Sequence, residues 1–213
     1  MKAVLVVNNG VEINDVEIPK PKSNEVLVKV FACGLNRADL MVADGGVHGA
    51  SGGSGTIVGM EFSGEVVNFG NEVKELSIGD RVMCSGSSAW AEYAITDWGR
   101  VIKIPDNNMD FDTACTYPIA LGTMHNAIIT TGEFTKGQSI LIQGASSGVG
   151  MMGLQIAKYM QAQIVIGTST KTEKHNKLKQ MGADVIFNSK DPSWVDEVLN
   201  LTNGEGVDLI VDQ

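Results

Sequence analysis

The chain has 213 residues, of which 43% are hydrophobic, so it can bury a substantial core in one large or two smaller domains. Its formal net charge of −9 and sequence pI of about 4.8 argue against nucleic acid and anionic membrane surfaces, because an acidic protein repels both. No apolar run approaches the roughly 18 residues of a membrane span, and the N-terminus lacks a signal-peptide pattern. Three widely spaced cysteines favour reduced thiols in the cytoplasm over a disulfide framework.

The first half of the sequence has the pattern of a β domain. Short apolar or alternating segments, separated by turn pairs such as Gly79 and Asp80, predict strands. The predicted strands cover residues 1–7, 11–18, 25–32, 64–69 and 80–84. Little helical periodicity occurs before Ile104, so we expect a mostly antiparallel, barrel-like domain.

After Pro105 the pattern changes to alternating strands and helices. Gly182 is expected to end one helix, and Asp191-Pro192-Ser193 to begin the next with proline at the first helical position. The predicted elements are helices 111–117 and 119–131, strand 139–143, helix 148–160, strand 163–168, helix 171–180, strand 184–187, helix 192–202 and strand 207–212. Such alternation predicts an α/β fold with a parallel, doubly wound sheet. The expected domains are residues 1–121 and 122–213.

The stretch from Ser139 to Gly150 has the organisation of a dinucleotide-binding turn. An apolar strand runs into small residues and then into a helical pattern, whose first N–H groups and partial positive charge favour a pyrophosphate. Against the pattern G-x-G-x-x-G, the three positions fall on Ala145, Ser147 and Gly150. The alternative is an ordinary strand-to-helix connection. We predict that a nicotinamide dinucleotide is bound by Ala145, Ser146, Ser147, Gly148, Val149 and Gly150.

Several ordered motifs resemble the medium-chain dehydrogenase/reductase superfamily and narrow the resemblance to its zinc-independent quinone oxidoreductase branch, related to zeta-crystallin. The motifs are CGLNRADL at 33–40, GMEFSGEV at 59–66, GDRV at 79–82, AEY at 91–93, the turn at 144–150 and KQMGAD at 179–184. The resemblance implies a GroES-like β-barrel domain followed by a Rossmann domain. Family members are usually longer, so we expect this Rossmann domain to be truncated, with a C-terminally incomplete sheet.

The resemblance also bears on metal binding. Zinc enzymes of the superfamily hold the catalytic ion with thiolate, imidazole and carboxylate ligands. By the resemblance, the thiolate position falls on Asn36 and the imidazole position on Met60, which leaves only Glu61. A carboxamide and a thioether do not replace those ligands, and the four clustered cysteines of a structural zinc site are missing near Cys84. We therefore expect no metal.

The end of the second Rossmann strand predicts NADPH as the cofactor. Enzymes that prefer NAD usually place Asp or Glu there, to accept hydrogen bonds from the ribose. Here no acid occupies that position, and we expect Lys171 and Lys174, with the hydroxyls of Thr168 and Ser169, to contact the 2′-phosphate. The alternative for both lysines is a solvated helix face. Asn188, after the third strand, is expected to face the adenosine.

The expected reaction is hydride transfer from NADPH to an electron-poor acceptor, a quinone or an α,β-unsaturated carbonyl, which depends mainly on alignment of the two reactants. By the resemblance, Asn36 lies beside the nicotinamide and the acceptor, Thr123 contacts the nicotinamide end, and Met60 lines the pocket. His48 is the candidate proton donor, since imidazole titrates near neutrality. The alternatives are an exposed loop residue for His48 and an ordinary helix residue for Thr123.

Two other functions stay open. A 2-enoyl-thioester reductase of the same superfamily is the first, although the tyrosine that such enzymes carry beyond the Asn-x-x-Asp motif is missing here. A non-catalytic NADPH-binding or interaction protein, comparable with the crystallin use of this fold, is the second. The expected partners are a small-molecule substrate and a second copy of the chain in a homodimer.

Overall fold

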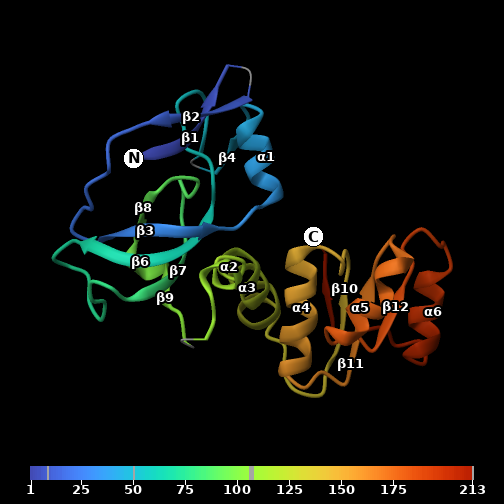
Figure 1. The fold of residues 1–213 in the computed structure, drawn as a ribbon. Helices are drawn as coiled ribbons and strands as arrows, with labels where there is room; N and C mark the ends of the chain where they lie inside the picture. The colour runs from blue at the N-terminus through green and yellow to red at the C-terminus, as the bar shows by residue number, and fades with distance from the viewer. Residues whose placement is uncertain (9, 50, 106–107, 213) are drawn as a thin grey trace. The chain divides into compact units, whose positions relative to one another are not determined.

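The computed structural model describes residues 1–8, 10–49, 51–105 and 108–212. The chain divides into two compact units, Met1–Ile119 and Ala120–Gln213 (Figure 1). This division lies two residues before the expected boundary between residues 121 and 122. Each unit has its own hydrophobic core, and each is described below by itself.

Unit 1 is built on a curled, antiparallel five-stranded sheet. Its strand order is β8 (Tyr93–Asp97), β3 (Glu25–Cys33), β6 (Glu61–Phe69), β7 (Arg81–Ser85) and β9 (Val101–Lys103). Two register shifts in the β3–β6 ladder bend these long strands, as β-bulges do. The side chains inside the curl form the main core, and those fully buried include Val26, Val28, Phe62, Val66 and Val82.

Smaller elements complete unit 1. A hairpin of β1 (Lys2–Val7) and β2 (Gly10–Asp15) is bridged to the rest through Ala3 with Ala91 and Leu5 with Ile57. The other elements are α1 (Arg37–Ala43), the two-residue strands β4 (Val47–His48) and β5 (Ser51–Gly52), the 3₁₀ turn η1 (Trp98–Arg100) and α2 (Phe111–Ala114). The strands β8 and β9 and the helix α1 were absent from the sequence prediction.

Unit 2 is a parallel sheet with helices on both faces. The strand order is β12 (Val185–Phe187), β11 (Ile164–Thr168), β10 (Ser139–Ile142) and β13 (Leu209–Val211). Helices α4 (Gly148–Tyr159) and α5 (His175–Gln180) contribute to the core that contains Ile140 and Ile142. Helix α6 (Trp194–Leu201) packs with Leu141 on the opposite face. The predicted α/β fold, a β domain followed by a doubly wound parallel sheet, is therefore confirmed.

Two helix predictions in this half need correction. The predicted helix at 119–131 is an α-helix, α3 (Pro118–His125), followed by the π-helical turn η2 (Asn126–Thr131). The helix predicted from Pro192 begins at Trp194, because Asp191 Oδ1 accepts a hydrogen bond of 3.0 Å from the Ser193 amide and holds a preceding turn. A 3₁₀ turn, η3 (Thr172–Lys174), similarly precedes α5. Within the described part of the chain, no helix has the length and apolar character to cross a membrane.

Candidate functional site

In unit 2, the turn between β10 and α4 is held in place by the end of β11. Gly144, two residues after the end of β10, has φ of +63°, which favours glycine and lets the chain turn there. The Thr168 carbonyl accepts a hydrogen bond of 2.9 Å from the Ala145 amide, and the Thr168 hydroxyl accepts one of 3.3 Å from the Gly144 amide. The neighbouring parallel strand therefore sets the conformation of the turn.

The first residues of α4 form an anion site. Ser147 is the N-cap, and its hydroxyl accepts a hydrogen bond of 2.9 Å from the Gly150 amide. The amides of Gly148 and Val149 have no hydrogen-bond partner among the described residues. Because α4 is 12 residues long, its dipole adds a partial positive charge where these amides lie. This end of the helix can bind a phosphate group.

The positions of the turn that require glycine are not the same as the three positions of the G-x-G-x-x-G alignment. Gly144 supplies the left-handed backbone, and the side chain of Ala145 is fully buried in the core of unit 2. A Cβ on Gly150 would lie 2.6 Å from the Gly144 carbonyl oxygen, so α4 can approach the turn only with glycine there. A Cβ on Gly148 would meet nothing within 4 Å, which leaves open space beside its amide.

The polar residues after β11 divide into two groups. Thr168 and Ser169 are buried, and the Ser169 hydroxyl accepts a hydrogen bond of 3.1 Å from the Lys171 amide. Both hydroxyls thus hold the local backbone, and their contact with a 2′-phosphate stays a prediction. Lys171 is exposed and Lys174 half-exposed, and neither has an ion-pair partner among the described residues. Asn188 accepts a hydrogen bond of 3.1 Å from the Lys190 amide within its own turn.

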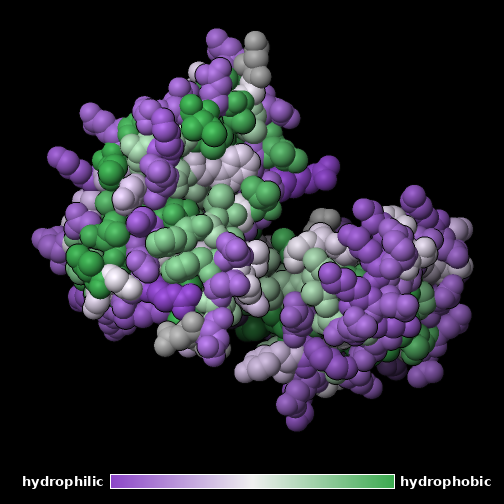
Figure 2. Space-filling view, in the orientation of Figure 1, coloured by the Kyte–Doolittle hydropathy of each residue, from purple (hydrophilic) through white to green (hydrophobic). Residues whose placement is uncertain are grey.

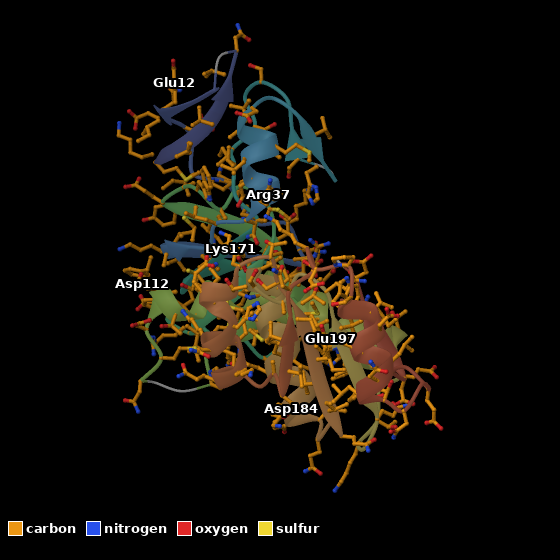
Figure 3. The ribbon with its side chains drawn as sticks, turned by 90° about the vertical axis from the view of Figure 1, so that its right-hand side faces the viewer. Glu12, Arg37, Asp112, Lys171, Asp184 and Glu197 are labelled. Carbon is orange, nitrogen blue, oxygen red and sulfur yellow. The ribbon has the colours of Figure 1, made fainter. Side chains whose placement is uncertain are left out.

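In unit 1, Asn36 lies directly before α1. Arg37, the first residue of that helix, is labelled in Figure 3. Its backbone amide donates a hydrogen bond of 2.7 Å to Asp39 Oδ2, which fastens the first helical turn. Its side-chain Nδ2 donates a hydrogen bond of 2.8 Å to Glu61 Oε1. The second N–H of the amide has no partner among the described residues. Asn36 is therefore held by both its backbone and its side chain.

Glu61 is the site residue that the sequence prediction did not include. It begins β6, is 4% exposed, and accepts a second hydrogen bond of 2.9 Å at Oε2 from the Ile119 amide. Burial raises the pKa of this carboxyl above its ordinary value, although the two hydrogen bonds oppose the shift. The available signal was a single charged residue within the otherwise uncharged run GMEFSG at 59–64, since a buried charge is almost always paired.

Three other titratable groups lie in this region of unit 1. Asp39 is 1% exposed, its Oδ1 has no hydrogen-bond partner among the described residues, and burial raises its pKa. Burial also raises the pKa of Cys33, and that of Cys115 to about 11, so both are thiols near neutral pH. Across the described ranges, no group of three or more His, Cys, Asp or Glu residues could hold a metal ion.

The remaining predicted residues have fewer contacts. Met60 is half-buried directly before β6, and its carbonyl accepts a hydrogen bond of 2.8 Å from the Gly86 amide. His48 is exposed on β4, and Thr123 is exposed on α3. The structure thus brings Asn36 and Glu61 together within unit 1, and residues 144–150 and Thr168 together within unit 2.

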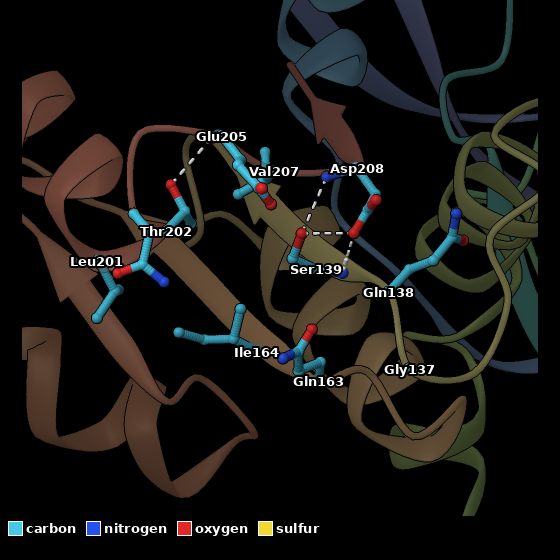
Figure 4. A pocket seen from close by; sticks show the side chains of 12 residues that line it. Gly137, Gln138, Ser139, Gln163, Ile164, Leu201, Thr202, Glu205, Val207 and Asp208 are labelled. Atoms are coloured by element: carbon cyan, nitrogen blue, oxygen red, sulfur yellow. Dashed lines mark hydrogen bonds between the residues drawn. The ribbon is translucent and has the colours of Figure 1, made fainter.

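Two surface cavities contain none of the predicted site residues. One, of about 540 Å³, lies at the amino ends of β10 and β11, opposite the turn at 144–150, and contains the Ser139–Asp208 hydrogen bonds (Figure 4). The other, of about 430 Å³, is apolar and includes Phe31 and Trp90 of unit 1. Figure 2 shows hydrophobic residues reaching the surface of this unit among hydrophilic ones.

Comparisons with known proteins agree with this two-unit architecture. The family model described as "Alcohol dehydrogenase GroES-like domain" matches residues 22–106, and the one described as "Zinc-binding dehydrogenase" matches residues 148–213. Human quinone oxidoreductase is 30% identical over 219 residues, covering 100% of this chain and 66% of that protein. A highly reducing polyketide synthase of Didymella fabae is 35% identical over 193 residues, covering 90% of this chain and 10% of that protein.

Solved structures give the same result. A quinone oxidoreductase of Pseudomonas syringae pv. tomato has a TM-score of 0.87 at 26% identity, covering 99% of this chain and 66% of that one. The CurK enoyl reductase has a TM-score of 0.90 at 25% identity, covering 100% and 67%. A mycobacterial protein complexed with NADPH has a TM-score of 0.86 at 27% identity, covering 100% and 66%.

The chain spans about two thirds of the length of these solved proteins and a small part of the much longer polyketide synthase. Its family-model matches cover parts of both units. The chain belongs to the zinc-independent quinone oxidoreductase branch of the medium-chain dehydrogenase/reductase superfamily.

Proposed function

We propose that the protein is an NADPH-dependent oxidoreductase that transfers a hydride to quinones or α,β-unsaturated carbonyls. The observation that carries the proposal is the start of α4, where the free amides of Gly148 and Val149 and the open space beside Gly148 fit a pyrophosphate. The 30% identity to human quinone oxidoreductase and the fold shared with an NADPH complex support it. The chemistry that the dinucleotide supplies when bound is a hydride from C4 of its nicotinamide ring.

Residues of this chain are assigned to binding the cofactor and the acceptor. The amides of Gly148 and Val149 bind the pyrophosphate, with Ser146 and Ser147 beside them, and the ammonium groups of Lys171 and Lys174 bind the 2′-phosphate. The free N–H of Asn36 donates to the acceptor oxygen, where negative charge develops. Further contacts with the nicotinamide, the acceptor or the adenosine come from Thr123, Met60, His48 and Asn188.

A second acceptor class is an enoyl thioester. The observation that favours it is the similarity to the CurK enoyl reductase and to a polyketide synthase. Both classes require the same alignment, since each accepts a hydride at carbon while electrons move to a carbonyl oxygen. His48 is exposed on β4, where it can exchange protons with solvent and protonate the second carbon of an enoyl acceptor.

The test is oxidation of NADPH by the purified chain, followed by the loss of reduced-nicotinamide absorbance. We expect turnover with 9,10-phenanthrenequinone that exceeds turnover with a crotonyl thioester. Faster turnover of the crotonyl thioester would make the enoyl reductase the function. Binding of NADPH without turnover of either acceptor would contradict an enzymatic role for these residues and favour a dinucleotide-binding protein.

Cofactor preference provides the first mutational prediction. Lys171→Ala and Lys174→Ala are each expected to weaken NADPH binding by about 5-fold while leaving NADH binding unchanged, because only NADPH carries the 2′-phosphate. Isothermal titration of both nucleotides measures the effect. Lys179→Ala, which removes an exposed lysine from α5, is the matched control. Equal losses for NADH and NADPH would contradict the assignment.

Two properties of the whole protein are also proposed. The described cysteines, Cys33, Cys84 and Cys115, are free thiols, which supports residence in the reducing cytoplasm. A homodimer is the proposed assembly, and sedimentation velocity of the purified chain tests it.

A further inference from the structure

Glu61 links two hydrogen-bond donors that are distant in sequence. Its Oε1 accepts from Asn36 Nδ2 at 2.8 Å, and its Oε2 accepts from the Ile119 amide at 2.9 Å at the start of α3. The residue is only 4% exposed. An isolated carboxylate at such depth is costly, and its two hydrogen bonds offset part of that cost. The link is therefore a built feature of unit 1.

The backbone beside this carboxylate has no space for a side chain. A Cβ on Gly34 would lie 2.4 Å from Glu61 Oε1 and 2.6 Å from Glu61 Cγ. The Gly34 amide in turn donates a hydrogen bond of 3.1 Å to the Glu61 carbonyl. Glycine at this position lets the Glu61 side chain lie against the segment that leads to Asn36.

A carboxylate also determines which way the Asn36 amide is turned. An ionised carboxylate only accepts hydrogen bonds, so the amide must present its nitrogen, and not its oxygen, to Glu61. One N–H is used in this bond, and the other has no partner among the described residues. Glu61 thereby decides which polar atoms of Asn36 remain for a ligand.

We propose that Glu61 is a positioning residue for hydride transfer, which orients the Asn36 amide so that its free N–H donates to the acceptor oxygen. The inference rests on the proposed function. As the hydride adds to carbon, the π electrons of the acceptor move to its carbonyl oxygen, and the Asn36 N–H stabilises the charge there. With an enoyl acceptor, His48 then supplies the proton that gives the saturated carbonyl. With a quinone, solvent supplies the proton, and the keto product tautomerises to the hydroquinone by losing the added C–H proton and gaining one at oxygen.

Glu61→Gln separates positioning from simple packing, because it keeps the shape and changes the polarity of one atom. The new amide can accept from Ile119 with its oxygen only by presenting its NH₂ group to Asn36. Asn36 must then flip and offer its oxygen, which leaves the buried hydrogen bonds satisfied but presents different atoms to the acceptor. We expect kcat with phenanthrenequinone to fall about 10- to 100-fold, with the KM for NADPH changed less than about 2-fold.

The matched control is Ser63→Ala. Ser63 lies on the same strand, is fully buried, and donates a hydrogen bond of 2.6 Å to the Phe111 carbonyl without contacting Asn36. We expect its kcat to stay within about 2-fold of wild type. In an Asn36→Ala background, Glu61→Gln should lower kcat no further. If Glu61→Gln lowered kcat in that background by as much as it does in wild type, the inference would be overturned, since Glu61 would then act independently of Asn36.

A readout that needs no turnover distinguishes failure of this inference from failure of the proposed function. In side-chain amide NMR spectra of the full chain, the Asn36 NH₂ pair, assigned by its loss in Asn36→Ala, should exchange slowly with water. Its two proton shifts should move in Glu61→Gln but not in Ser63→Ala. The positioning role would be refuted if the Asn36 NH₂ protons exchanged with water as fast as those of a free amide in wild type. It would also be refuted if their chemical shifts were unchanged in Glu61→Gln. An inactive wild type with the expected NMR result would refute only the function.

Discussion

Gly150→Ala is expected to weaken NADPH binding about 10- to 100-fold, because the added methyl group disrupts the phosphate-binding turn. Its Cβ would lie 2.6 Å from the Gly144 carbonyl oxygen and 2.8 Å from the Ala145 Cα, and both of these are backbone atoms. The helix must move away, which also disturbs the hydrogen bond between the Gly150 amide and Ser147. Alanine has a helix propensity up to about 1 kcal/mol more favourable than that of glycine. Overpacking costs roughly 1–3 kcal/mol, so the substitution is destabilising over most of that range.

The matched variant is Gly148→Ala, two residues earlier in the same helix. Nothing lies within 4 Å of its added Cβ, so we expect unchanged stability to urea. NADPH binding should nevertheless weaken, because the methyl group would occupy the open space assigned to the pyrophosphate. Isothermal titration and urea denaturation of both variants measure the difference. Unchanged binding in both would place the phosphate groups elsewhere and contradict the assignment of the turn.

Leu154→Ala is expected to destabilise unit 2 by about 2–5 kcal/mol, the usual cost of a cavity in a well-packed core. Leu154 is 0% exposed and lies on α4 in the main core of the unit. Gly167 of β11 lies close beneath it, since a Cβ there would be 3.6 Å from Leu154 Cδ2. Collapse around the missing side chain is limited by the sheet. Native-state hydrogen exchange of the β10 and β11 amides measures the loss in this unit.

The control removes the same side chain from a partly exposed position of unit 2. Leu201, the last residue of α6, is 42% exposed, so Leu201→Ala should cost less than about 1 kcal/mol. Equal losses in the two variants would show that α4 is not packed as described. Leu154 is not part of the phosphate-binding turn. Leu154→Ala should therefore weaken NADPH binding only as far as it unfolds unit 2.

Local patterns in the sequence determined the course of unit 2. The apolar strand before Gly144, the small residues after it and the helical period from Gly148 onward predict a strand, a turn and a helix through contacts between near neighbours. The same kind of pattern marks Lys171 and Lys174 as cations after a strand that lacks a terminal acid. These features depend on residues close together in the chain, so they can be predicted without knowing how distant segments pack.

Tertiary structure alone decided which polar groups meet. Asn36 and Glu61 are 25 residues apart, and the antiparallel register that pairs Cys33 with Phe62 brings them together. The parallel pairing of β11 with β10 buries Thr168 and turns its hydroxyl and carbonyl to the turn at Gly144, where the sequence suggested a phosphate contact. A strand's period specifies its faces, but the partner that satisfies a buried polar group follows from register, and register is a property of the whole sheet.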